Sequence, residues 1–91
     1  MTGLIERKEF EVVQVIFDRL TALLQDTFDD DDIVARPELS ASDVDGWDSL
    51  AHVRFLLAVE RAFGVRFSAA EANSFANVGD LANAIAAKNH V

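Results

Sequence analysis

The sequence predicts an all-α domain: an antiparallel four-helix bundle of three longer helices and one short helix, with a long loop between the first two. Three observations favour this fold. Apolar residues recur at helical spacing in separate segments. Only four glycines and one proline interrupt a chain that is 51% hydrophobic. Helix-capping patterns precede the later segments. The length of 91 residues fits one domain, residues 1–91, with a thin core.

The first helix is expected from about Leu4 to Asp26. Its apolar stripe is Phe10, Val13, Phe17, Leu20 and Leu24, widened by Val12, Ile16 and Leu23. Residues 27–47 have no clear period and include four consecutive aspartates at 29–32. A loop of this length is uncommon in a compact domain. We therefore expect its scattered apolar residues to hold it partly against the core: Ile33, Val34, Leu39 and Val44.

The second helix is expected from Asp48 to about Phe63. Asp48 suits the N-cap, and Gly64 follows at the position where a left-handed residue commonly ends a helix. The run from Ser68 to Glu71 is typical of a capping box that opens a short third helix. A second box-like pattern at residues 77–80 predicts a last helix that ends near Lys88.

The composition narrows the function. A net charge of −8 disfavours nucleic acid as a partner and favours basic protein surfaces. The absence of cysteine excludes a disulfide framework, a thiolate metal site and a thiol enzyme. The N-terminus has neither a signal-peptide pattern nor a membrane span, so we expect a cytoplasmic protein. We also expect the protein to be a monomer.

Two catalytic or metal-binding interpretations of the acidic junction at residues 43–52 are weak. Ser49 and His52 are three residues apart, but the surroundings lack the second glycine of a nucleophile elbow, and His90 lies at the chain end. We therefore interpret His52 as a residue at the rim of the core. The aspartates at 43 and 45 match only a fragment of a calcium loop, so no metal site is expected.

Ser49 would occupy the first position inside the second helix. A helix N-terminus favours a nearby phosphate, although serine is also merely tolerated there. The same helix has two stripes. One suits the core: His52, Phe55, Leu56, Val59 and Phe63. The other, made of Leu50, Arg54, Leu57 and Arg61, we expect to face partners.

Residues 45–85 resemble the acyl carrier proteins. The resemblance includes the D-S-L attachment motif at Asp48-Ser49-Leu50, the "VERAFGVRF" end of the second helix and "NVGDL" at the start of the last. It implies that 4′-phosphopantetheine is transferred from coenzyme A to Ser49 by a holo-synthase phosphopantetheinyl transferase. Asp48 would contact the modifying enzyme. The arm would carry acyl groups as thioesters, so the protein itself would be no enzyme.

The resemblance also implies partners and cargo. Acyl- or aminoacyl-activating ligases, synthases and transferases would use the carrier in turn. A sheltered acyl chain would lie among core residues: Phe55, Leu56, Val59, Phe63, Phe67, Phe75, Leu81 and Ile85. Bulky phenylalanines leave little room for a long chain.

One departure from the fatty-acid carriers concerns the second helix, which is formally neutral over residues 48–63 instead of acidic. Together with Trp47, this neutrality favours a specialised stand-alone carrier for a modified lipid, a short acid or a secondary metabolite. An aminoacyl or peptidyl carrier and an unmodified helical interaction module remain alternatives.

Overall fold

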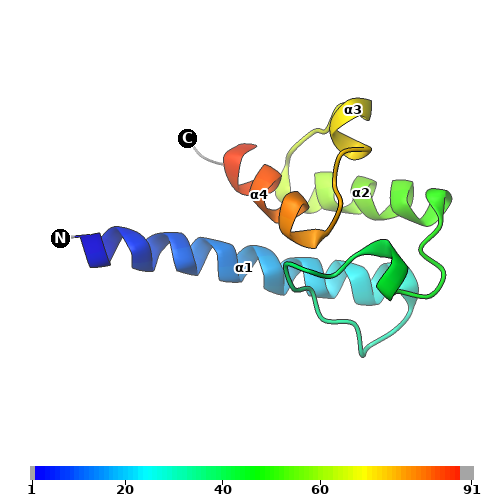
Figure 1. Ribbon diagram of the computed structural model, residues 1–91, viewed down its shortest axis with the longest axis horizontal. Helices are drawn as coiled ribbons and strands as arrows, with labels where there is room; N and C mark the ends of the chain where they lie inside the picture. Colours follow the sequence, from blue (N-terminus) through cyan, green and yellow to red (C-terminus); the bar gives the residue numbers. More distant parts are fainter. Residues whose placement is uncertain (1, 89–91) are drawn as a thin grey trace.

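The computed structural model describes the backbone of residues 2–88 and the side chains of residues 12–88. This part of the chain forms four α-helices, a single 3-10 turn and no strand. The helices are α1 (Thr2–Phe28), α2 (Ser49–Phe63), α3 (Ala69–Ala72) and α4 (Val78–Lys88), and the 3-10 turn η1 (Ala41–Asp43) lies in the long loop. Figure 1 shows α1 along one side of the molecule, with α2 and α4 packed against it. The all-helical class, with one short helix and a long first loop, is confirmed.

The core is built where α1, α2 and α4 meet. Leu20 and Leu24 from α1, Phe55 and Val59 from α2, and Ile85 from α4 are fully buried. Complete burial of one such side chain stabilises the folded state by about 1.5–3 kcal/mol. The core stripes expected on α2 and the later half of α1 therefore face one another as the spacing of their apolar residues indicates.

The N-terminal half of α1 corrects the prediction for its apolar stripe. Val13 is 40% exposed and Val12 is 53% exposed, although both were expected on the core side. At about 1.5 Å per residue, the 27 residues of α1 reach well past the 15 residues of α2. Figure 1 shows the early part of α1 projecting beyond its neighbours. Phe10, also assigned to the stripe, lies outside the described side chains.

The long loop is held against α1 as well as against the core. Ile33 and Leu39 are buried, as expected, and Val44 is half-buried against the core, but Val34 is 59% exposed, which corrects its assignment. The Gln25 side-chain amide donates to the carbonyls of Asp31 and Ile33, both at 3.1 Å. These bonds hold the loop backbone beside α1. In this position the side chain of Ile33 is buried and that of Val34, the next residue, points to solvent.

Backbone carbonyl groups of the long loop cap the start of α4. The first N–H groups of a helix have no partner within the helix. Here the N–H of Val78 donates to the Leu39 carbonyl at 2.8 Å, and that of Gly79 donates to the Pro37 carbonyl at 2.9 Å. A Cβ on Gly79 would lie 2.9 Å from this carbonyl oxygen. Only glycine allows the loop to approach α4 this closely.

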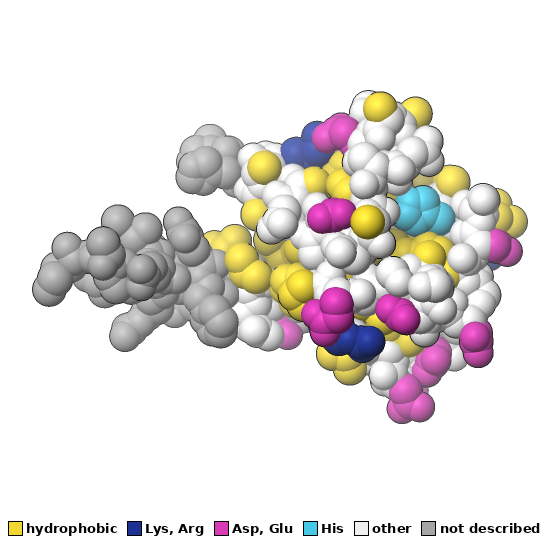
Figure 2. All heavy atoms as spheres, viewed as in Figure 1, with side chains coloured by type: hydrophobic (Ala, Val, Ile, Leu, Met, Phe, Trp, Pro, Cys, Tyr) yellow, Lys and Arg dark blue, Asp and Glu magenta, His cyan; other side chains and the backbone are white. Residues whose placement is uncertain are grey.

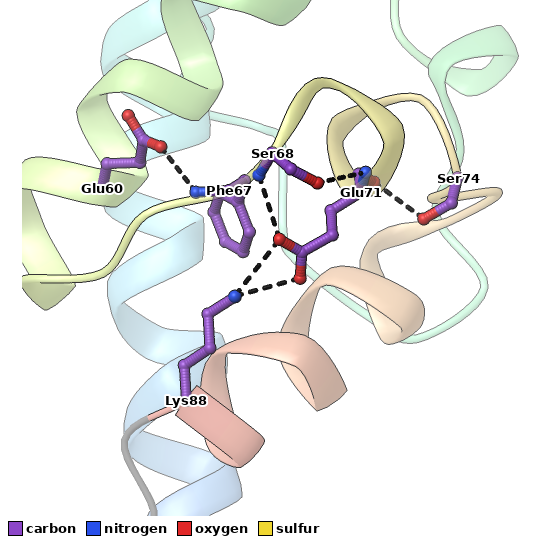
Figure 3. Close-up of polar contacts among 6 residues, drawn as sticks. All are labelled: Glu60, Phe67, Ser68, Glu71, Ser74 and Lys88. Carbon is purple, nitrogen blue, oxygen red and sulfur yellow. Dashed lines mark hydrogen bonds and ion pairs between the residues drawn. The ribbon is translucent and has the colours of Figure 1, made fainter.

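Helix α3 is tied to its surroundings mainly by polar contacts, which Figure 3 shows. The Ser68 hydroxyl accepts from the Glu71 N–H at 3.1 Å, and the Glu71 carboxylate accepts from the Ser68 N–H at 2.9 Å, which confirms the capping box. Lys88 at the end of α4 reaches the same carboxylate at 3.0 Å. The Ser68 N–H and the Lys88 ammonium lower the pKa of Glu71. This contribution to stability is therefore present above the ordinary carboxyl pKa and is lost as pH falls through the lowered one.

We predict that Gly79→Ala destabilises the fold by about 1–3 kcal/mol, because the added methyl group meets loop backbone that cannot move freely. The matched control is Asn83→Ala on the exposed side of the same helix, which should stabilise slightly or have no effect. Urea unfolding followed by circular dichroism measures both. A Gly79→Ala protein as stable as the control would contradict the close approach.

Candidate functional site

The candidate site is built around the start of α2. Asp48 is extended and caps the helix, because its carboxylate accepts the Ala51 N–H at 2.8 Å. Ser49 is therefore the first helical residue, as predicted, and its side chain is exposed. Two tight turns precede the helix: the Trp47 N–H donates to the Val44 carbonyl at 3.4 Å, and the Asp48 N–H donates to the carbonyl of Gly46, which has a φ of 84°, at 2.9 Å. The Ser49 hydroxyl is therefore exposed to solvent at the end of a helix whose start is held in place.

Trp47 anchors the residues before α2 to the core. Its half-buried indole packs against Phe28 at 5.1 Å and edge-on against Phe55 at 5.4 Å, measured between ring centroids. The indole N–H donates to Nδ1 of His52 at 3.1 Å, and Nε2 of His52 lies 3.0 Å from the Ala72 carbonyl oxygen. Because Nδ1 accepts, the neutral tautomer with its proton on Nε2 satisfies both contacts.

These contacts decide the role of His52. A serine nucleophile needs a free imidazole nitrogen within reach of its hydroxyl, but both nitrogens of His52 are occupied by other partners. The arrangement gives no support to hydrolase chemistry at Ser49. His52 is half-buried, which confirms its place at the rim of the core. Its bond to Trp47 was not predicted, because five residues of separation across a helix start fit no regular contact pattern. His90 lies outside the described residues.

Two hollows flank this histidine. The outer one, of about 480 Å³, lies beside Ser49 and is lined by Trp47, Asp48, His52, Val53 and Asn73 among others. The inner one has a volume of about 60 Å³ and lies between Trp47, Phe55, Phe75 and Leu81. Of the residues expected to line a cargo cavity, only these last three do so. The others pack elsewhere in or against the core: Leu56, Val59, Phe63, Phe67 and Ile85.

Comparison with known proteins agrees with this geometry. The family model described as the phosphopantetheine attachment site matches residues 18–85. The solution structure of the holo acyl carrier protein from Geobacter metallireducens is 40% identical, covers 79% of this chain and 83% of its own, and superposes with a TM-score of 0.75.

The chain belongs to the acyl carrier protein family. A carrier of this family is not itself an enzyme, and it bears a covalently attached phosphopantetheine group. It works with a phosphopantetheinyl transferase and with biosynthetic enzymes. A comparison with curated protein sequences finds no match.

The residues of this carrier fit such an arm. A phosphate needs an accessible hydroxyl and a favourable local field, and Ser49 offers an exposed hydroxyl at the N-terminus of a 15-residue helix. The hollow beside it has room for the rest of the arm.

The outward face of α2 matches the expected second stripe. Leu50 is 65% exposed and Leu57 is 46% exposed, and Arg54 and Arg61 are exposed with them. Sequence reasoning missed two members of this surface. Val53 is 54% exposed close to Ser49. Arg66 joins Leu57 and Arg61 around an open hollow of about 510 Å³ at the far end of α2. Arg66 follows the helix end, so helical spacing did not include it.

The charges of the carrier are separated. Residues 29–47 contain seven acidic side chains and one arginine, a formal charge of −6 out of the total of −8. Figure 2 shows acidic side chains spread over the end of the molecule that carries this loop. Glu60 is the one acid within α2 itself, and it accepts the Phe67 N–H at 2.8 Å. Among the described residues, Arg54 and Arg61 are exposed and form no ion pair, so no carboxylate there neutralises their charge.

Two further features are absent from the part of the chain that the structure describes. No group of three acidic or histidine side chains converges there as a metal site would require. No helix in this part combines the length and the apolar character that a membrane crossing needs.

We predict that Asp48→Ala destabilises the carrier by about 1 kcal/mol, because the Ala51 N–H loses its capping acceptor. Asp48→Asn keeps a capping oxygen and should retain most of the stability. Asp45→Ala, an exposed acid three residues earlier, controls for the change in charge. Urea unfolding followed by circular dichroism tests the series, and equal losses in all three variants would refute the capping role.

Proposed function

We propose that this carrier holds acyl groups on a phosphopantetheine arm attached to Ser49, and that it serves a specialised lipid or secondary-metabolite pathway. The arm ends in a thiol that carries acyl groups as thioesters. The observation that carries the assignment of Ser49 is its exposed hydroxyl at the first position of α2, in a chain whose family attaches the arm at such a site. Asp48 presents this hydroxyl and, in the proposal, contacts the modifying enzyme.

Two features support a specialised pathway. The inner hollow of about 60 Å³ is less than half the size of the roughly 150 Å³ cavity that accepts a benzene molecule, so a long acyl chain does not fit without rearrangement. The segment of residues 48–63, α2 with its Asp48 cap, is formally neutral and differs from the acidic surface that the resemblance leads one to expect of fatty-acid carriers.

The docking surface of the proposal is the outward face of α2: Leu50, Arg54, Leu57 and Arg61, extended by Val53 and Arg66. Among the described residues, the ion pairs are Arg36 with Glu38 and Lys88 with Glu71, so neither pair neutralises this face. Exposed leucines framed by guanidinium groups are complementary to an apolar patch with an acidic rim. We therefore expect the dedicated partner enzymes to present acidic side chains here, in contrast to the basic partners that net charge alone favours.

The proposal also includes three features that the sequence leads us to expect: an antiparallel bundle, a monomeric state and a cytoplasmic location. The partners are a holo-synthase phosphopantetheinyl transferase followed by ligases, synthases or transferases. Packing of α1 against both α2 and α4 supports the bundle.

We predict that the purified protein, incubated with coenzyme A, magnesium and a broad phosphopantetheinyl transferase, gains the mass of one phosphopantetheine. Ser49→Ala should gain nothing, because it lacks the accepting hydroxyl. Ser42→Ala, an exposed serine in the loop, is the matched control and should be modified like the wild type. Intact-mass spectrometry reads all three. Modification that persists in Ser49→Ala would overturn the assignment.

We predict that Arg54→Glu with Arg61→Glu lowers kcat/KM for acyl loading by the dedicated loading enzyme about tenfold or more at low salt, because electrostatic steering is reversed. The effect should shrink as ionic strength rises. The control is Arg36→Glu, an exposed arginine in the loop. Unfolding curves should remain within about 0.5 kcal/mol of the wild type, because the changed side chains are exposed. Unchanged kinetics with the dedicated enzyme would remove this face from the docking surface.

A further inference from the structure

His52 has no chemical role in the proposed function, yet it is one of the most constrained polar side chains near Ser49. It is half-buried, and both of its nitrogens are bonded. Its partners come from different segments: the Trp47 indole precedes α2, and the Ala72 carbonyl belongs to the last residue of α3. His52 therefore bridges the start of α2 and the end of α3.

The bridge lies where the two hollows meet. Ala41, Trp47 and His52 line the outer hollow beside Ser49 and also the inner hollow between Phe55 and Leu81. The same side chains thus form a wall between the place where an arm would lie and the interior. The direct route from Ser49 to the inner hollow passes this wall.

The wall is held on both sides. Trp47 is packed between Phe28 and Phe55, so its ring cannot turn away without breaking core contacts. Displacing His52 breaks its bonds to the indole N–H and to the Ala72 carbonyl. The last residue of α3 and the imidazole would then lose partners in a partly apolar setting, which is unfavourable. Behind the wall there is space for little more than two water molecules.

We propose that His52 determines how this carrier holds its cargo: it closes the direct route to the inner hollow, so that the acyl group stays outside, beside Ser49, and remains accessible. The inference rests on the proposed function, because it needs an arm on Ser49. Removing the imidazole joins the two hollows into one space, and the carrier then shelters a medium-length chain. His52 thereby acts as a specificity-determining residue that selects exposed over sheltered presentation.

The experiment loads acetyl and octanoyl groups onto the wild type, His52→Ala and His52→Gln, from the corresponding coenzyme A thioesters and a broad transferase. Intact mass first checks loading. Two properties are then measured on each loaded protein: the rate of thioester cleavage by hydroxylamine, relative to the same acyl group on free pantetheine, and the NMR signal of the indole N–H of Trp47, the one tryptophan in the chain.

We expect the wild type to show equal relative cleavage rates for acetyl and octanoyl groups, and an indole signal that does not depend on the cargo. In His52→Ala the octanoyl thioester should be cleaved about tenfold more slowly. Burial of two methylene groups favours the sheltered form over the exposed one by about that factor. The indole signal should then differ between acetyl and octanoyl forms. His52→Gln, whose amide can accept from the indole and donate to Ala72, should behave like the wild type.

Several outcomes would overturn the inference. An octanoyl thioester that is already protected about tenfold in the wild type shows an interior open to cargo. Equal reactivity of octanoyl His52→Ala and octanoyl wild type shows that His52 is not the barrier. Because the wild-type comparison needs no variant, a His52→Ala protein that fails to fold leaves the inference testable. A wild type that gains no mass refutes the attachment proposal and this inference with it, whereas normal loading with a protected octanoyl group refutes the inference alone.

Discussion

The structure depends on the two backbone hydrogen bonds between the loop carbonyls of Pro37 and Leu39 and the first N–H groups of α4. A 20-residue loop in a small domain must find partners for its buried polar groups, and a helix start must find acceptors. Here the loop carbonyls accept hydrogen bonds from the first N–H groups of the helix, so both needs are met. Gly79 allows the contact because a side chain would meet the Pro37 carbonyl oxygen. The loop thereby covers one side of the core, where Ile33 and Leu39 are buried.

The anchored loop also sets the position of the candidate site. It delivers Trp47 into the space between Phe28 and Phe55, directly before α2 begins. The residue after the Asp48 cap then emerges at the surface with its hydroxyl exposed. An accessible attachment point on a firmly packed helix start suits a carrier, because partner enzymes must reach the arm while the domain keeps its shape.

Sequence reasoning succeeded where the signal was local. The Asp48 cap, the left-handed Gly64 and the Ser68–Glu71 capping box each involve residues within four positions of one another. It was wrong for Val13 and Val34, whose burial depends on which element lies opposite. A helical stripe indicates which face is apolar, but it carries no information on where the neighbouring helix ends. Arg66 was missed for a related reason, since it reaches the outward surface of α2 from beyond the helix.

The sequence by itself determined four helices, the first-turn position of Ser49 and the mixed apolar and basic stripe of α2, because periodicity and capping act over three or four residues. Only the tertiary structure decided that His52 joins Trp47 to α3, that the hollow behind it is about 60 Å³, and that the ion pairs among the described residues leave out the arginines of α2. These features arise from contacts between residues as far apart as His52 and Ala72, and such contacts exist only once the helices have packed.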